Sequence, residues 1–228
     1  FQKHNEVEYA VMPAEMPEDL IAVPTNELLS TSPMAPEIQT PDWMKNSVIY
    51  EVNTRQFNAN GTFKSFAPEI PRIKNLGVDV LWFMPIYPIG LLNRKGGLGS
   101  YYSIKNYHDV NPEFGTLADF KAIVNQAHAQ GLKVILDWVG NHTAWDHPWI
   151  TEHPDWYVHD STGKIITPWD WTDVAQLNFK NAELRKAMIG EMKFWITECG
   201  IDGFRCDVAF LVPRSFWEEA RAELEKEK

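Results

Sequence analysis

The sequence predicts an α/β protein on the plan of the (β/α)8, or TIM, barrel, with about the first four β/α units present and a small insertion after the third strand. Short apolar β-rich runs alternate with helical patterns along residues 43–228, which indicates a parallel sheet with helices outside it. Polar residues follow successive strands, at the end where barrel active sites lie. A dinucleotide-binding sheet would require a glycine-rich phosphate loop after the first strand, and this sequence has none there.

Four runs rich in Val, Ile, Leu and aromatic residues are expected to be the strands. They are Ser47–Val52, Val78–Met84, Lys133–Val139 and Gly203–Val208. One face of such a half-barrel stays uncovered, because the remaining strands would pack there. We expect Phe83 and Ile135 to lie on that face and to meet water.

Helices are expected between and after these strands, where apolar residues recur with a period near 3.6. The expected helices are Phe66–Leu76, Leu117–Gln130, Ala182–Cys199 and a last one that follows Pro213 and ends in the charged stretch Arg221–Lys228. The second is the clearest, because Phe120, Ile123 and Val124 share one face and Gly131 follows as a stop signal.

Composition divides the chain into an N-terminal arm and a folded part. Residues 1–42 contain six of the fifteen prolines, eight acidic residues and one Lys, and are expected to form an acidic, Pro-rich arm or linker. Residues 43–228 would form the N-terminal half of the barrel. Within it, residues 143–181 are expected to form a small inserted subdomain, whose dense tryptophans either close that subdomain or offer platforms for a ring-shaped ligand.

Charge and hydropathy exclude several classes of function. The net charge of -10, without a run of Lys or Arg, argues against nucleic acid as a partner. The longest apolar stretch, Val80–Leu92, contains two prolines and is too short to span a membrane. Two cysteines cannot form a disulfide framework or a four-thiolate zinc site. Neither cellular location nor oligomeric state can be inferred from these features.

The fourth expected strand carries the most reactive pattern. Because side chains alternate along a strand, Arg205 and Asp207 face the same way, while Phe204 and Cys206 face the helices. A guanidinium beside a carboxylate favours its ionised form. Such an oriented carboxylate at a strand end suits a covalent glycosidase nucleophile, although an ordinary buried ion pair would look the same in the sequence.

The third expected strand also ends in polar residues. Asp137 lies near its end, and Asn141 and His142 follow in the loop. An amide and a neutral imidazole at a barrel mouth can bind sugar hydroxyls as donor and acceptor. Turn-forming residues that cap a strand are the alternative. For Asp137 we expect a supporting task, which is to hold neighbours such as Arg205.

Several motifs together resemble the α-amylase superfamily, glycoside hydrolase family thirteen. Its first signature region is similar to Asp137–His142, and its second, which bears the nucleophile, is similar to Gly203–Asp207. The loop after its second strand resembles Gly99–Tyr107 with Asn111–Thr116, and its short insertion motif resembles Val174–Asn178. Each motif is modest alone, but their order matches the expected strands and loops.

The resemblance implies a retaining glycoside hydrolase that acts on α-linked glucans such as starch, with α-1,4 bonds as the expected target. It assigns Asp207 as the nucleophile, Arg205 as its orienting partner, and His142 and Tyr102 as residues that bind and stack on the sugar. We group Asp137 with these binding residues. The general acid, a Glu after a fifth strand, would lie beyond Lys228, so the chain is expected to be inactive alone.

The resemblance also raises the question of a metal. It implies Asn141 as a calcium ligand, but Gln176 stands where the family commonly has a carboxylate. We therefore expect no cofactor in the chemistry and at most a weak calcium site. Phe210 and Leu211 replace a common Lys-His pair, which leaves the preference for sugars beyond the cleavage point open.

Three alternatives remain at this point. A glucan transferase of the same family would use the same covalent intermediate with a different acceptor. A non-catalytic carbohydrate-binding homologue would account for the tryptophans, but it has no need of an Arg/Asp pair at a strand end. A metalloenzyme is disfavoured, because the four histidines between residues 142 and 159 are spaced five or six apart, unlike metal-binding pairs on a helix.

Overall fold

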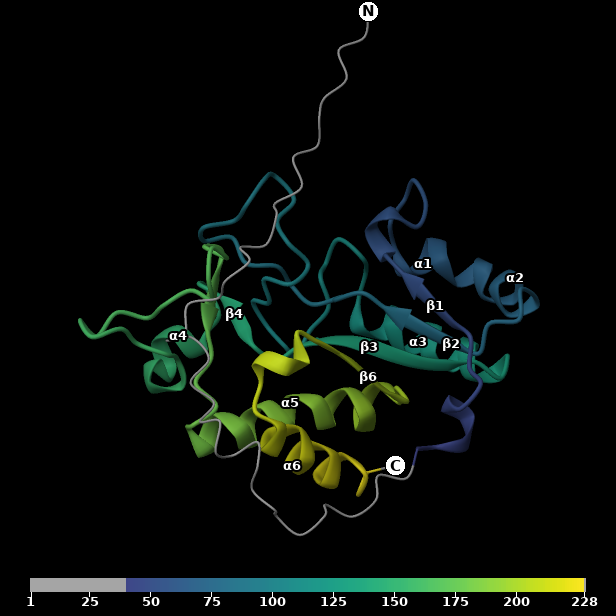
Figure 1. Ribbon diagram of the computed structural model, residues 1–228. Coiled ribbons are helices and arrows are strands. Elements are labelled where there is room, and N and C mark those ends of the chain that lie inside the picture. Colours follow the sequence, from purple (N-terminus) through teal and green to yellow (C-terminus); the bar gives the residue numbers. More distant parts are fainter. Residues whose placement is uncertain (1–39, 228) are drawn as a thin grey trace, which may run out of the picture. The chain divides into compact units, whose positions relative to one another are not determined.

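The computed structural model describes residues 40–227 (Figure 1). Most of the expected arm, residues 1–39, lies outside the described residues. The chain divides into two units, Phe1–Lys45 and Asn46–Lys228. In the first, the described part contains a short 3-10 helix, η2 (Asp42–Met44). All the elements below belong to the second.

A four-stranded parallel sheet forms the centre of the second unit. Its strands are β1 (Ile49–Val52), β2 (Val80–Phe83), β3 (Lys133–Val139) and β6 (Gly203–Asp207). They pair in the order β1-β2-β3-β6, so spatial order follows chain order. A doubly wound sheet reverses its order at a switch point, whereas a barrel adds each new strand beside the last. The observed order is that of a barrel segment.

Helices cover one face of this sheet. They are α1 (Phe63–Phe66), α2 (Ile70–Asn75), α3 (Leu117–Ala129), α5 (Ala182–Cys199) and α6 (Arg214–Leu224). The first expected helix starts three residues early, because Thr62 and Ser65 form a capping box. It is also interrupted by the 3-10 helix η4 (Ala67–Glu69), because Pro68 has no backbone N–H group to donate to an α-helical hydrogen bond.

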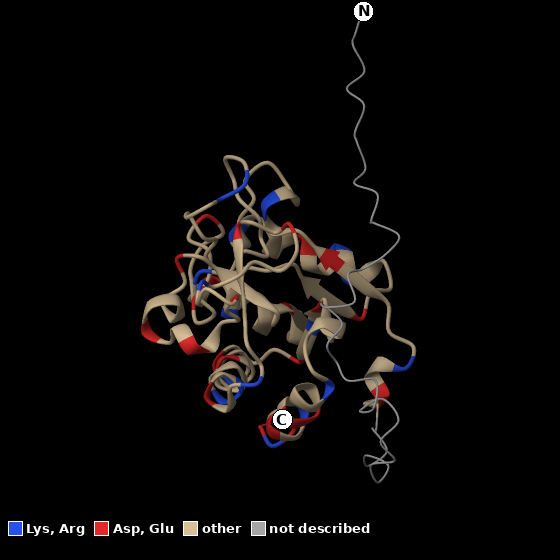
Figure 2. Ribbon diagram, turned by 60° about the vertical axis from the view of Figure 1, so that its left-hand side comes forward, with Lys and Arg blue, Asp and Glu red and all other residues tan. Residues whose placement is uncertain are grey.

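The other helix ends follow sequence signals. Thr116 and Asp119 form a second capping box at the start of α3. Asn181 caps α5 by accepting from two backbone N–H groups, and Gly200 ends that helix with φ 73°. Ion pairs join α5 to α6, among them Lys193–Glu223 at 3.2 Å. Figure 2 shows the acidic and basic residues interspersed along these helices.

Alternation along the strands separates a packed face from an uncovered one. Phe83 lies on the packed face, where it contacts Phe66 and Phe120 at ring separations of 5.3 and 5.5 Å. The expectation that Phe83 meets water was therefore wrong. In the register it is Trp82 that aligns with Ile135, and both side chains are only partly buried. The prediction assigned Phe83 to the wrong face of the sheet, because side chains alternate between the two faces and a shift of one residue exchanges them.

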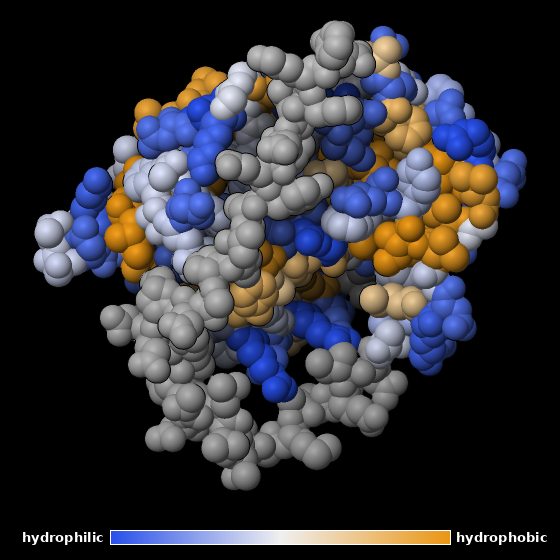
Figure 3. All heavy atoms as spheres, turned by 45° about the horizontal axis from the view of Figure 1, so that its top comes forward, coloured by the Kyte–Doolittle hydropathy of each residue, from blue (hydrophilic) through white to orange (hydrophobic). Residues whose placement is uncertain are grey.

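The sheet has unpaired edges at β1 and β6 within residues 40–227. Val48 and Ile49 at the start of β1 and Leu76 at the end of α2 are more than half exposed, at 52%, 56% and 63%. Figure 3 shows hydrophobic side chains gathered on the side of the molecule where β1 and α2 lie. Exposed apolar patches of this kind mark surfaces that contact other protein or ligand.

The segment after β3 contains a second, smaller sheet. β4 (His142–Ala144) and β5 (Val174–Gln176) make a two-stranded antiparallel sheet, with α4 (Trp149–Glu152) and the 3-10 helix η5 (Pro154–Trp156) between them. Trp156 is buried there, whereas Trp169 is 39% exposed. The tryptophans thus divide between closing the segment and facing solvent. No helix in residues 40–227 is long and apolar enough to cross a membrane.

Candidate active site

Three charged side chains meet at the carboxyl ends of β3 and β6. The parallel register aligns Asp137 with Arg205 and Val139 with Asp207. Because residues two apart share a face, Arg205 and Asp207 both project from the face opposite the helices. The predicted pairing of Arg205 with Asp207 is present, and Asp137 joins it from the neighbouring strand.

Arg205 holds both carboxylates through one nitrogen. Its Nη1 lies 2.8 Å from Oδ1 of Asp207 and 3.0 and 3.2 Å from the two oxygens of Asp137. The guanidinium carbon also lies 5.0 Å from the ring centre of Trp82, a cation–π contact. Burial works against the charged guanidinium, but the two carboxylates outweigh it, and the pKa of Arg205 is raised.

Asp137 is fully buried and has several donors around it. Its Oδ2 accepts from Trp82 Nε1 and from the Tyr102 hydroxyl, both at 3.3 Å. Burial nevertheless dominates over Arg205 and raises the pKa of Asp137 to about 6. This carboxyl is thus poised to hold a proton just below neutral pH.

Asp207 differs from Asp137 in access. Its side chain is 15% exposed. Arg205 binds Oδ1, and Oδ2 makes no hydrogen bond to any residue of the described part of the chain. One oxygen is therefore oriented and the other is available to an incoming group.

The loop after β2 brings Tyr102 to this site. Burial, followed by the charge of Asp137, raises the pKa of its phenol, so the hydroxyl stays protonated and donates to Asp137. Tyr101 holds the same loop to the end of β1, because its hydroxyl donates to Asn53 Oδ1 at 3.0 Å. Arg55 stacks on the Tyr101 ring, at 4.5 Å from its centre.

His142 and Asn141 lie at the start of the inserted segment and are both almost fully buried. Burial lowers the pKa of His142 to about 4, so its imidazole is neutral near pH 7. Asn141 Nδ2 lies 3.2 Å from His142 Nδ1, and the rings of His142 and Trp171 meet edge to face at 5.5 Å.

Two residues of the site were missed by sequence reasoning. Trp82 donates to Asp137, and Tyr107 donates its hydroxyl to the carbonyls of Val139 and His142 at 2.7 and 3.1 Å. Tyr107 thereby fixes the backbone between β3 and β4. A signal for Trp82 existed, because it shares the phase of Ile135 on the uncovered face, but Tyr107 lies in a loop without periodicity.

The residues around Asn141 offer little negative charge to a calcium ion. Asn141 and Gln176 are neutral amides, and the nearby Asp173 forms an ion pair with Lys95 at 3.4 Å. Amide oxygens can bind calcium, but they add no charge, and the number of charged ligands sets how tightly calcium binds. Within residues 40–227, no three His, Cys, Asp or Glu side chains gather as metal ligands would. Asn141 as a calcium ligand stays a prediction, and no step below depends on it.

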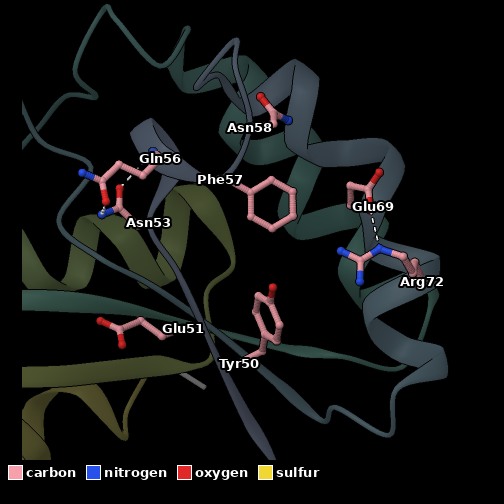
Figure 4. A pocket seen from close by; sticks show the side chains of 8 residues that line it. All are labelled: Tyr50, Glu51, Asn53, Gln56, Phe57, Asn58, Glu69 and Arg72. Carbon is pink, nitrogen blue, oxygen red and sulfur yellow. Dashed lines mark hydrogen bonds and ion pairs between the residues drawn. The ribbon is translucent and has the colours of Figure 1, made fainter. Parts of the chain in front are cut away.

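A separate hollow of 580 Å³ lies at the edge of β1. Its lining residues come from β1, from the segment that follows β1, and from η4 and α2 (Figure 4). Tyr50 and Phe57 face it, and Glu69 and Arg72 form an ion pair at its rim. None of the predicted site residues lines this hollow, so it does not belong to the charged cluster.

Comparisons with known proteins agree with this geometry. The chain matches the alpha-amylase catalytic domain over residues 51–173 and 152–227. It is 34% identical over 214 residues to a trehalose-6-phosphate hydrolase of Bacillus subtilis. The aligned region covers 77% of this chain and 37% of that relative. It is 33% identical over 215 residues to a trehalose synthase of Pimelobacter, covering 77% and 36%.

A solved structure is also similar. An alpha-amylase from Lactobacillus plantarum superposes with a TM-score of 0.78 and 46% identity, over 81% of this chain and 43% of that one. The chain thus spans less than half the length of these relatives. The residues matched by the family model, 51–173 and 152–227, include Tyr102, Asp137, His142, Arg205 and Asp207.

Proposed function

Because the chain belongs to the alpha-amylase family, we propose that it forms part of a retaining glycoside hydrolase that cleaves α-1,4 bonds in starch-like glucans. The observation that carries this proposal is the bridge from Arg205 Nη1 to Asp207 Oδ1, which leaves Oδ2 of a partly exposed carboxylate available. A retaining enzyme needs an oriented, ionised nucleophile of this kind.

The reaction follows from that arrangement. Oδ2 of Asp207 attacks the anomeric carbon and forms a glycosyl ester, while the bond from that carbon to the leaving oxygen breaks. An acid on the opposite face gives its proton to the leaving oxygen. Water then attacks the same carbon, releases the carboxylate and returns a proton to the acid. Arg205 keeps the carboxylate oriented through its bond to Oδ1 before and after these steps.

The neighbouring residues suit a neutral sugar. His142 is uncharged near pH 7 and can exchange hydrogen bonds with hydroxyls. Tyr102 presents a half-buried ring beside Asp137. Further out, Trp169 meets Trp171 edge to face at 4.9 Å, and the exposed indole of Trp169 offers an apolar platform for a further ring of the chain.

Asp137 does not fit the role of the acid, although its pKa is raised to about 6. It lies on the strand next to Asp207 and is fully buried under Trp82 and Tyr102. It therefore approaches a sugar from the same side as the nucleophile, whereas the acid of a retaining enzyme must stand opposite, at about 5 Å. We propose that the acid comes from outside these 228 residues, and that this chain alone does not hydrolyse glucan.

Replacing the nucleophile tests the proposal directly. In the full-length protein that contains this chain, Asp207→Asn should reduce release of reducing sugar from soluble starch by several orders of magnitude and leave the melting temperature unchanged. Asp160→Asn, the same chemical change in an exposed turn, is the matched control. Turnover of Asp207→Asn within tenfold of wild type would exclude Asp207 as the nucleophile.

A transferase is the second candidate, since one relative is a trehalose synthase. Both reactions form the same ester on Asp207, and they differ in whether water or a sugar hydroxyl resolves it. Product analysis with labelled glucose added as an acceptor separates them. Labelled oligosaccharides in excess over free reducing sugar would favour the transferase. Binding of maltoheptaose without any turnover would instead favour a non-catalytic homologue.

A further inference from the structure

The residue that follows Asp207 has an unusual backbone. Val208 lies in the left-handed region, with φ 38° and ψ 42°. Within residues 40–227 only Asn93 and Trp169 share a positive φ among non-glycine residues. For a β-branched side chain this conformation costs free energy and persists only where the surroundings impose it.

Several hydrogen bonds hold the turn that contains Val208, among them one from Val212 N–H to the Ala209 carbonyl at 3.2 Å. β6 ends at Asp207, and the 3-10 helix η6 (Ala209–Leu211) starts two residues later. The Val208 carbonyl accepts from Leu211 N–H at 2.9 Å. From α6, Trp217 Nε1 donates to the Ala209 carbonyl, also at 2.9 Å. This is a side-chain hydrogen bond from another element to the residue next to the strained one.

Trp217 is itself fixed against the end of β3. A Cβ placed on Gly140 would come within 3.3 Å of its Cη2 atom, so the indole packs closely against backbone that has no side chain there. Gly140 directly precedes Asn141 and His142. The indole thus connects the loop after β3 to the turn after β6.

We propose that Trp217 is a positioning residue for Asp207: by holding the Ala209 carbonyl, its indole N–H keeps Val208 in the left-handed conformation that ends β6 at the nucleophile. This inference rests on the proposed function. In the register of β3 with β6, a strand that continued past Asp207 would place Val208 opposite Gly140. If Val208 relaxed to an extended conformation, β6 would continue past Asp207. The Asp207 carboxylate would then move away from Arg205.

A double-mutant cycle tests this coupling in the full-length protein. Trp217→Phe keeps an aromatic ring against Gly140 but loses the donor, and should lower kcat for starch about tenfold with KM within about twofold of wild type. Adding Val208→Gly should restore most of kcat, because glycine adopts the left-handed region without strain and no longer needs the bond. Ala209→Gly, which adds a glycine one residue later, is the matched control and should not restore it.

Two measurements on the full-length protein do not depend on catalysis. Hydrogen exchange of the Leu211 amide should accelerate in Trp217→Phe and slow again with Val208→Gly. Val208→Gly alone should raise the melting temperature by about 2–4 °C, since strain is removed. A kcat of Trp217→Phe within twofold of wild type, a failure of Val208→Gly to restore it, or a lower melting temperature for Val208→Gly would overturn the proposal. If wild type turned over no glucan, the proposed function would fail, while hydrogen exchange would still decide whether Trp217 holds the turn.

Discussion

Replacing His147 by Asn should remove a large part of the protein's sensitivity to acid. The His147 side chain is 4% exposed, its Nδ1 accepts from Trp149 N–H at 3.1 Å, and its Nε2 is buried with no hydrogen-bond partner among residues 40–227. Burial, only partly offset by the charge of Asp146, lowers the pKa of this imidazole from 6.5 to about 3. The folded protein therefore keeps His147 neutral at pH values where the unfolded chain protonates it.

The sign and size follow from proton linkage. Because the folded pKa is depressed, the contribution of His147 to stability is complete above about pH 6.5 and falls as the pH drops towards 3. At pH 5, about 1.5 pH units below the ordinary pKa of His, the free energy of unfolding is lower by about 2 kcal/mol. For a protein of this size, this corresponds to a drop in melting temperature of about 4–8 °C. His142 acts in the same direction, since its pKa is about 4.

Urea unfolding of wild type and His147→Asn at pH 7 and pH 5 measures this effect. The Asn amide oxygen can still accept from Trp149 N–H, and the variant should lose about 2 kcal/mol less than wild type between the two pH values. His147→Phe is the internal control, because it also abolishes titration but loses that acceptor. Both variants should show the shallower pH dependence despite different stabilities at pH 7. An unchanged pH dependence in both would refute the reasoning.

Three further predictions follow from the same geometry. Asp137→Asn should lose more stability than wild type as the pH falls from about 6 to about 4, because protonation of Asp137 in the folded state partly offsets the loss caused by His147 and His142; urea unfolding at pH 4.5 and pH 7 checks this. Trp169→Ala should weaken maltoheptaose binding about threefold to tenfold and leave the melting temperature unchanged, since its indole is 39% exposed; titration calorimetry measures it. Chelation should lower the melting temperature by less than about 2 °C. A drop of tens of degrees, reversed only by calcium, would show that the site at Asn141 is real.

Much of the sheet could be predicted because strand burial leaves a strong pattern. The observed strands β2 and β3 lie within the runs expected for them, since both are flanked by turn residues and rich in β-branched or aromatic side chains. The phase within β2 was wrong at Phe83. A run apolar at every position, such as Val80–Phe83, contains no alternation that could tell its two faces apart.

The site was predictable where its residues share a strand. Arg205 and Asp207 pair because a period of two dictates their common face, and the structure contains that ion pair. The donors to Asp137 could not be predicted in the same way. Trp82 and Tyr102 reach it from 55 and 35 residues away in the chain, and sequence patterns carry no information about such distances.

The raised pKa of Asp137 changes how the charge of Arg205 is shared. One guanidinium nitrogen faces two carboxyl groups, so with both ionised it cannot fully compensate either. Burial raises the pKa of the fully buried Asp137 to about 6, so this carboxyl takes up a proton just below neutral pH. As Asp137 becomes neutral, the whole charge of Arg205 acts on the partly exposed Asp207. Two chemically identical side chains, one strand apart, are thereby separated into a group that supports and a group that can react.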